Sequence, residues 1–373
     1  EAPFKDVYFT SILRDEQGRK FSKSLGNSPD PIGLFDKYGT DATRFSVMLM
    51  SPQGSDVYFS ESGLEIGRNF MSKIWNASRF IMLNHDENFN DSINKDKLAF
   101  HDEWILSELD KTIKKVNAYY DSYQFNEAIK VIYEFTWSEF CDWYIELAKI
   151  NFQSTDQIVR NNTYILSRDV LKKILLLLHP VSPFITEEIW SYLKNESDDD
   201  IIISAWPKLS KENIVDDSET MSTLKEIVTS VRTIRSELNI LPSKKIDVLI
   251  SVNNADDKKL FEDLKDTITS LSKIDNLEID LNIKKPKKSA VGICKKCVAY
   301  VPLGDLVDTD SEIKRLTKRL NEVKDFINAI EKKLKNKSFI DKAPENIVNN
   351  EKNKLNDFIV ERDKIIDNIA MLK

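Results

Sequence analysis

The last part of the chain carries apolar residues at alternating spacings of three and four. The first run is Ile313, Leu316, Leu320, Val323, Ile327, Ile330 and Leu334, and the second is Val348, Leu355, Phe358, Ile365, Ile369 and Leu372. This spacing places each run along one side of an α-helix, and the break at 337–344 lets the second helix fold back on the first. Glu351 and Arg362 interrupt the second run. Residues 306–373 are therefore predicted to form an antiparallel coiled coil, roughly 40 Å long at about 1.5 Å per residue.

A helical pattern also fills residues 60–215. The first predicted helix carries Leu64, Gly67, Met71, Ile74, Ser78 and Ile81 at helical spacing. Further helices are predicted from Ile105 to Tyr120, over Val170 to Leu178, and from a cap at Ser182-Pro183 to Tyr192. Another is predicted from Phe125 through Trp143, with Ile129, Ile132, Phe135 and Trp143 on its apolar side. Four or five long helices with short connections form an antiparallel bundle.

Two shorter regions combine strands with helices. Residues 1–59 contain a predicted strand at 7–13, a turn at 14–18, and helices that begin at Asp30 and Asp41. Residues 216–305 contain predicted strands near 246–252, 277–283 and 298–301 and helices near 224–238 and 260–271, which suggests a small α+β unit. The predicted fold class is mainly α.

Composition narrows the class of protein. A chain of 373 residues is too long to form a single ordinary hydrophobic core, so several domains are expected. The formal charge of −7 argues against indiscriminate nucleic-acid binding, although Lys and Arg gathered on one face still allow RNA binding. Three cysteines provide no disulfide framework, which fits a cytoplasmic location, and no apolar run is long enough for a membrane helix. Because the chain begins with Glu1 rather than methionine, we expect it to be part of a longer protein.

A motif that carries chemistry lies between Gly18 and Asn27. Lys20 and Lys23 stand three apart, and Ser22 and Ser24 add hydroxyl groups. Such a loop suits the negative charge of a polyphosphate, because ammonium groups and hydroxyls can both bind phosphate oxygens. By themselves these residues favour an ordinary solvated loop, because two lysines near two serines arise often by chance in a chain with 54 Lys and Arg residues. Cys294 and Cys297 are expected to be incidental, because zinc would need four ligands and Cys141 is the one further cysteine. No bound metal is expected.

The run Lys20-Phe21-Ser22-Lys23-Ser24 resembles the lysine-serine signature of class I aminoacyl-tRNA synthetases, with Phe21 where the family usually has methionine. Runs 68–70, 73–80 and 137–144 resemble the valyl-tRNA synthetases in particular. The resemblance covers essentially the whole chain. It implies the C-terminal portion of such an enzyme, divided into the end of a Rossmann-type catalytic domain at 1–59, a helical anticodon-binding bundle at 60–215, an α+β connector at 216–305 and a coiled-coil tRNA-binding arm at 306–373.

The resemblance also implies roles for the loop. Lys23 is expected to be the main catalytic lysine, Lys20 its companion, and Ser22 and Ser24 further ATP-binding residues. ATP, accompanied by Mg²⁺, would activate valine, which is then transferred to tRNA(Val). Phe21 is expected to pack, so its exchange for methionine should matter little. The family's His-x-Gly-His stretch is absent from this chain, whose histidines His85, His101 and His179 are expected to be structural. We therefore expect the chain alone to be inactive.

Two groups of residues are expected to contact tRNA. The first bundle helix combines cations with aromatic rings, as recognition of unstacked bases requires, in Arg68, Lys73, Trp75, Arg79 and Phe80. An amphipathic helix has such a face in any case, and Trp75 is also compatible with the core. The terminal arm supplies Arg315 and Arg319. The alternatives are an isoleucyl- or leucyl-type synthetase and a non-catalytic tRNA-binding or coiled-coil protein. A monomer without membrane contact is expected.

Overall fold

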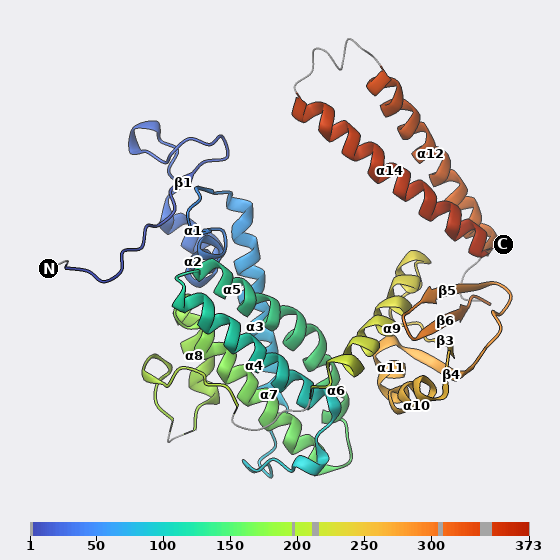
Figure 1. The fold of residues 1–373 in the computed structure, drawn as a ribbon, viewed down its shortest axis with the longest axis horizontal. Helices are drawn as coiled ribbons and strands as arrows, with labels where there is room; N and C mark the ends of the chain where they lie inside the picture. The colour runs from blue at the N-terminus through green and yellow to red at the C-terminus, as the bar shows by residue number, and fades with distance from the viewer. Residues whose placement is uncertain (1–2, 196–197, 211–215, 305–308, 336–344, 373) are drawn as a thin grey trace. The chain divides into compact units, whose positions relative to one another are not determined.

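The computed structural model describes residues 3–195, 198–210, 216–304, 309–335 and 345–372 (Figure 1). It is mostly helical and divides into two compact units, Glu1–Met221 and Ser222–Lys373. Among the described residues, none of the helices combines the length and apolar character that crossing a bilayer demands.

The first unit begins with a short two-stranded pairing. β1 (Leu13–Arg14) lies parallel to β2 (Val57–Tyr58), with Leu13 opposite Val57. The prediction of a strand over 7–13 is wrong for 7–12, which form no strand in the described part of the chain. Val7 and Phe9 are exposed instead, because none of the strands in the described ranges pairs with 7–12 to bury alternate side chains.

Two helices follow the loop at 18–27. α1 (Pro31–Tyr38) begins at the predicted cap, where the Asp30 carboxylate accepts the backbone N–H groups of Ile32 and Gly33. α2 (Thr40–Leu49) follows directly. It crosses the next helix closely, since the N–H of Gly67 donates to Ser46 Oγ at 3.0 Å.

The helical bundle has a long first helix that buries the predicted apolar side. All six predicted core positions, from Leu64 to Ile81, are buried. The bundle consists of α3 (Leu64–Leu83), α4 (Phe100–Asp121), α5 (Phe125–Glu134), α6 (Ile145–Phe152), α7 (Gln157–Leu178) and α8 (Pro183–Leu193).

A π-helical segment, η4 (Phe135–Tyr144), joins α5 to α6 and changes the predicted register. α-Helical spacing predicted that Trp143 continues the buried side after Phe135. Instead, Phe140 and Tyr144 are fully buried and Trp143 is half-buried. The wider turn rotates the later residues relative to an α-helix. Tyr144 then reaches Asp102 and donates a buried hydrogen bond of 3.1 Å to its Oδ1.

The predicted cap of α8 is wrong in the group that accepts the hydrogen bond. Ser182 precedes the helix, but its side chain makes no capping hydrogen bond. The N–H of Ile185 in the first turn donates instead to Asp41 Oδ2, on α2, at 2.6 Å. A carboxylate distant in sequence therefore binds the amide that a local cap would have satisfied.

The second unit contains a four-stranded sheet in the order β4-β3-β6-β5. Register places Ile250, Ile279 and Ala299 on one buried face. β3 and β4 are parallel, while β6 is antiparallel to both β3 and β5. The elements are α9 (Ser218–Glu237), β3 (Ile246–Val252), α10 (Ala255–Asp263), α11 (Lys265–Ser272), β4 (Ile274–Leu281), β5 (Ser289–Ile293) and β6 (Cys297–Pro302).

The predicted helix at 260–271 is two helices, α10 and α11, and β5 was not predicted.

Two long helices end the chain, α12 (Thr309–Lys335) and α14 (Glu345–Leu372). They lie side by side in opposite directions (Figure 1). The rings of Phe326 and Phe358 stack with their centroids 5.4 Å apart. Glu351, which interrupts the apolar run, pairs with Lys333 at 3.3 Å. Supercoiling of the two helices stays a prediction.

Candidate functional site

The loop at 18–27, or lysine loop, is built on a tight turn at Asp15. Its Oδ1 accepts the backbone N–H groups of Gln17 and Arg19, and Gly18 has a φ of +80°. A bridge between Arg14 and Lys20 closes this turn. The hydrogen bond from Asn27 is the first cause that holds the pKa of Asp15 at about 2, and the bonds from Arg19 add to it. Asp15 is therefore a carboxylate at neutral pH.

Asn27 connects the two sides of the loop. Its Nδ2 donates to Asp15 Oδ2 at 3.0 Å and to the carbonyl of Lys20 at 3.3 Å. Its Oδ1 accepts the backbone N–H of Ser22 at 3.0 Å. The Asn27 side chain thus binds the Asp15 carboxylate, the Lys20 carbonyl and the Ser22 N–H. These three hydrogen bonds define the path of the loop.

The loop itself contains one short 3₁₀ turn, η1 (Lys23–Leu25). Ser22 caps it by accepting the N–H of Ser24 at 3.2 Å, and the two hydroxyls lie 2.7 Å apart. Gly26 ends the turn in the left-handed region, with a φ of 62°. The structure therefore brings Ser22, Lys23 and Ser24 onto one turn.

Lys20 and Lys23 are both exposed to solvent. Within the described part of the chain, neither ammonium group is held in an ion pair. Two cations that are unneutralised and on flexible stems can reach a phosphate ligand at the surface.

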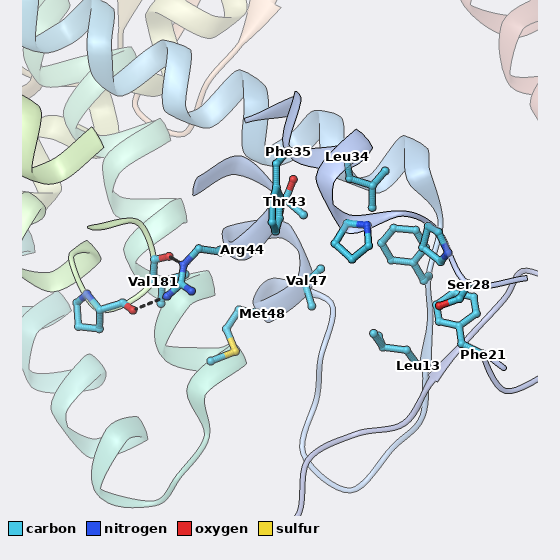
Figure 2. Close-up of a pocket in the computed structure, with 14 residues that line it drawn as sticks. Leu13, Phe21, Ser28, Leu34, Phe35, Thr43, Arg44, Val47, Met48 and Val181 are labelled. Carbon is cyan, nitrogen blue, oxygen red and sulfur yellow. Dashed lines mark hydrogen bonds between the residues drawn. The ribbon is translucent and has the colours of Figure 1, made fainter. Parts of the chain in front are cut away.

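Phe21 points from the loop into an apolar cavity of about 420 Å³ (Figure 2). Its ring packs edge-on against Phe59 with centroids 5.9 Å apart, and Leu13, Leu34 and Val47 also line the cavity. On the far side, the Arg44 guanidinium donates to the carbonyls of residues 181 and 180 at 2.9 and 3.3 Å. The expectation that Phe21 packs agrees with these contacts.

The predicted RNA-facing residues of α3 fall into two environments. Arg68, Trp75 and Arg79 are exposed, with Trp75 38% exposed, so this tryptophan is not a core residue. Arg68 pairs within the helix with Glu65 at 3.2 Å. This exposed side can meet a ligand without disturbing the bundle.

Lys73 and Phe80 are already engaged. Lys73 Nζ lies 2.5 Å from Asp142 and 3.8 Å from the centroid of the Trp137 ring. Phe80 packs edge-on against Phe152 at 5.8 Å, and the ammonium of Lys149 lies over its ring at 5.7 Å. Both side chains therefore have structural partners that a nucleic acid would have to displace or share.

In the helical pair, Arg319 is bound to two carboxylates. Its guanidinium lies 2.9 Å from Glu361 on α14 and 3.3 Å from Glu322 on its own helix. Arg315 lies in α12, but its side chain is outside the described residues.

The histidines have structural contacts. His101 is buried, which lowers its pKa, and its Nε2 lies 3.1 Å from Asn151 Nδ2. His179 Nδ1 lies 2.7 Å from the hydroxyl of Thr186. Within the described residues, no group of three or more His, Cys, Asp or Glu is placed to hold a metal ion.

The site residues that sequence reasoning missed are Asp15 and Asn27. A weak signal existed for Asp15, since Asp followed by Gly three residues later is typical of a turn. No local signal marks Asn27, because its three partners come from both sides of a loop.

Three family models match the chain. They are described as tRNA synthetases class I (I, L, M and V) at residues 1–60, the anticodon-binding domain of tRNA ligase at 102–250, and the valyl tRNA synthetase tRNA binding arm at 308–373. The lysine loop lies in the first range and Arg315 and Arg319 in the third. The α3 residues 68–80 lie between the first two ranges.

Curated relatives match nearly all of the chain. It is 38% identical over 355 residues to a valine–tRNA ligase of Nitratidesulfovibrio vulgaris, covering 94% of this chain and 40% of that relative. It is 37% identical to the Listeria innocua enzyme and 36% identical to the Bacillus subtilis enzyme of the same name, covering 100% of this chain and 42% of each. A solved Agrobacterium radiobacter K84 LeuRS–tRNA–LeuAMS complex is similar with a TM-score of 0.45 and 20% identity, over 73% of this chain and 31% of that one.

The chain thus belongs to the class I aminoacyl-tRNA synthetases. Within that class it belongs to the valine–tRNA ligase family. It spans about two fifths of the length of the curated relatives it matches, 40–42%.

Proposed function

We propose that this chain contributes to a valine–tRNA ligase that activates valine with ATP and transfers it to tRNA(Val). The observation that carries the proposal is the loop at 20–24. Lys20 precedes a serine-capped turn that begins at Lys23, both lysines are exposed and, among the described residues, unpaired, and Asn27 holds the backbone of Ser22. The names of the curated relatives favour valine over the isoleucine and leucine alternatives.

The proposed chemistry is adenylate formation. The valine carboxylate attacks the α-phosphate of ATP, and pyrophosphate leaves with Mg²⁺ as the counter-ion of the substrate. Negative charge grows on the departing phosphates, so a lysine that engages them in the transition state lowers the barrier. Lys23 has the main role and Lys20 the supporting one. Ser22 and Ser24 hold the turn and can offer hydroxyl donors to phosphate oxygens.

The helical elements are proposed to bind tRNA(Val). On the exposed side of α3, Trp75 would stack on unpaired tRNA bases, and Arg68 and Arg79 would neutralise phosphate groups. Lys73 and Phe80 would lie at the margin of this surface. The α12–α14 pair, as a coiled-coil arm, would contact the tRNA through Arg315 and Arg319. The proposal includes the division of the chain into four domains, whose boundaries follow residues 59, 215 and 305. The cytoplasmic location and monomeric state stay predictions.

The test is Lys23→Ala in the full-length enzyme, with valine-dependent ATP–pyrophosphate exchange as the readout. Loss of one transition-state ammonium contact should lower kcat by about 100-fold or more, with a smaller change in KM for ATP. Lys114→Ala is the matched control, since Lys114 is exposed on α4. Exchange within a few-fold of the unmodified enzyme would refute the role of Lys23.

Specificity is tested separately with the unmodified enzyme. Exchange should depend on valine rather than on isoleucine or leucine, and tRNA(Val) should accept the activated amino acid. Preference for either other amino acid would refute the valine assignment while leaving the phosphate role of the loop intact.

A further inference from the structure

Two cysteines face each other across the tip of the β5–β6 hairpin. Ile293 is opposite Val298, so Cys294 and Cys297 form the next opposite pair, joined by a loop of only two residues. The backbone N–H of Cys294 donates to the carbonyl of Cys297 at 2.9 Å. Residues in such a pair project to the same face with Cα atoms about 5.5 Å apart, within the roughly 4.4–6.8 Å that a disulfide spans.

The two thiols differ in access. Cys297 is 1% exposed, whereas Cys294 is half-buried at the hairpin tip. Helix α9 lies over this face, since a Cβ on Gly292 would come within 2.0 Å of Ser230 Oγ. From the same helix, Glu226 accepts the backbone N–H of Lys295 at 3.0 Å. Contacts with α9 therefore hold the hairpin tip in place, and Cys294 is more accessible to solvent than Cys297.

The thiols also differ in acidity. The hydrogen bond from Cys297 is the first cause that lowers the pKa of Cys294, and Ser230 adds a second such bond. The same contact and burial raise the pKa of Cys297. Cys294 is therefore the more acidic thiol of the pair, and Cys297 the less acidic one. Cys141 is different, because burial raises the pKa of this isolated thiol to about 12.

We propose that Cys294 and Cys297 are a redox-active dithiol that exchanges with a small-molecule disulfide of the glutathione class. The Cys294 thiolate attacks one sulfur of the oxidised reagent and releases one reagent thiolate. Cys297 then loses its proton, attacks Cys294 Sγ and releases the second reagent thiolate. The dithiol is oxidised by two electrons to a Cys294–Cys297 disulfide, and the reagent is reduced to two thiols. The direction reverses in excess reduced glutathione.

The experiment treats the chain with oxidised glutathione, then quenches with acid and maps the products by intact-mass and peptide mass spectrometry. The unmodified chain should lose two hydrogen atoms and yield a peptide with Cys294 joined to Cys297, and reduced glutathione should restore the thiols. Cys141→Ser is the matched control and should behave identically. Circular dichroism of each variant verifies folding.

Two single variants separate the roles of the sulfurs. Cys297→Ser should trap a stable glutathione adduct on Cys294, and Cys294→Ser should react at least tenfold more slowly, because a buried thiol of raised pKa remains. An unmodified chain that stays reduced, or that stops at the glutathione adduct, would overturn the proposal. Faster reaction of Cys297 than of Cys294 would overturn the assignment of the attacking sulfur. These outcomes are independent of ligase activity.

Discussion

The side chain of Asn27 holds the backbone of Ser22, whose N–H donates to Asn27 Oδ1 at 3.0 Å. The same amide also donates to Asp15 and to the carbonyl of Lys20. Replacement of Asn27 by alanine would release three attachments of the lysine loop. Loss of one such bond costs about 0.5–1.5 kcal/mol, so valine-dependent exchange in the full-length enzyme should fall by about tenfold.

The same variant should leave the bundle intact, because Asn27 contacts the loop and not the buried core. Thermal unfolding measured by circular dichroism should therefore shift little. A variant with normal exchange would show that the position of the loop does not depend on Asn27. A large fall in Tm would indicate a folding defect instead.

Phe21 should tolerate methionine but not alanine. The ring fills part of an apolar cavity and packs on Phe59. Methionine is flexible and apolar and can fill the same space, while alanine removes contacts worth about 3 kcal/mol or more when fully buried and less at this half-buried position. Exchange assays should rank Phe21→Met near the unmodified enzyme and Phe21→Ala well below it. Equal activity of both variants would show that the ring does not anchor the loop.

Asp41 should make stability depend on pH. Burial is the first cause that raises the pKa of its carboxyl, and its Oδ1 has no hydrogen-bond partner among the described residues. A raised folded-state pKa means that the folded protein binds more protons than the unfolded chain. This contribution to stability is therefore complete below about pH 4, the unfolded pKa, and is lost as pH rises through the folded pKa.

Asp41→Asn removes that titration and keeps an oxygen for the Ile185 N–H. The free energy of unfolding of the variant minus that of the unmodified chain should therefore rise with pH from about pH 4 upward. Asp41→Ala also removes the cap of α8 and should cost about 1–2 kcal/mol. Urea unfolding across this pH range measures both, and a difference that falls with pH would contradict the sign.

Gly67 should not accept alanine. A Cβ there would lie 2.2 Å from the carbonyl oxygen of Ala42 and 2.5 Å from Ser46 Oγ. Backbone cannot yield as a flexible side chain can, so α2 and α3 would have to separate, at a cost of about 1–3 kcal/mol. Chemical denaturation of Gly67→Ala beside Ser72→Ala, an exposed position on the same helix, measures this cost. Equal stability of the two variants would contradict the close crossing.

The exposed side of α3 should serve tRNA binding alone. Trp75→Ala and Arg79→Ala in the full-length enzyme remove a stacking ring, worth about 1–3 kcal/mol per base, and a phosphate partner. The KM for tRNA(Val) should rise about tenfold while valine-dependent exchange is unchanged. Lys73→Ala should differ by also lowering Tm, because Lys73 is bound to Asp142 and Trp137. Parallel loss of exchange and aminoacylation in the Trp75 variant would point to misfolding.

Local chemistry made much of this protein predictable. The cap at Asp30, the buried side of α3 and the apolar runs of the last two helices depend on neighbours within a few residues, so spacing alone indicates them. The lysine-serine run could likewise be recognised from the sequence, because its residues are contiguous. It marked where phosphate chemistry is expected.

The tertiary structure alone decided the contacts between distant residues. Asp41 rather than Ser182 caps α8, and the π-helical turn buries Tyr144 instead of Trp143. Residues 7–12 have no partner strand in the part of the chain that the structure describes. Each outcome depends on the packing of the chain, because packing determines which groups come within hydrogen-bonding or van der Waals distance. Such proximity is a property of the folded chain, and no periodicity in the sequence encodes it.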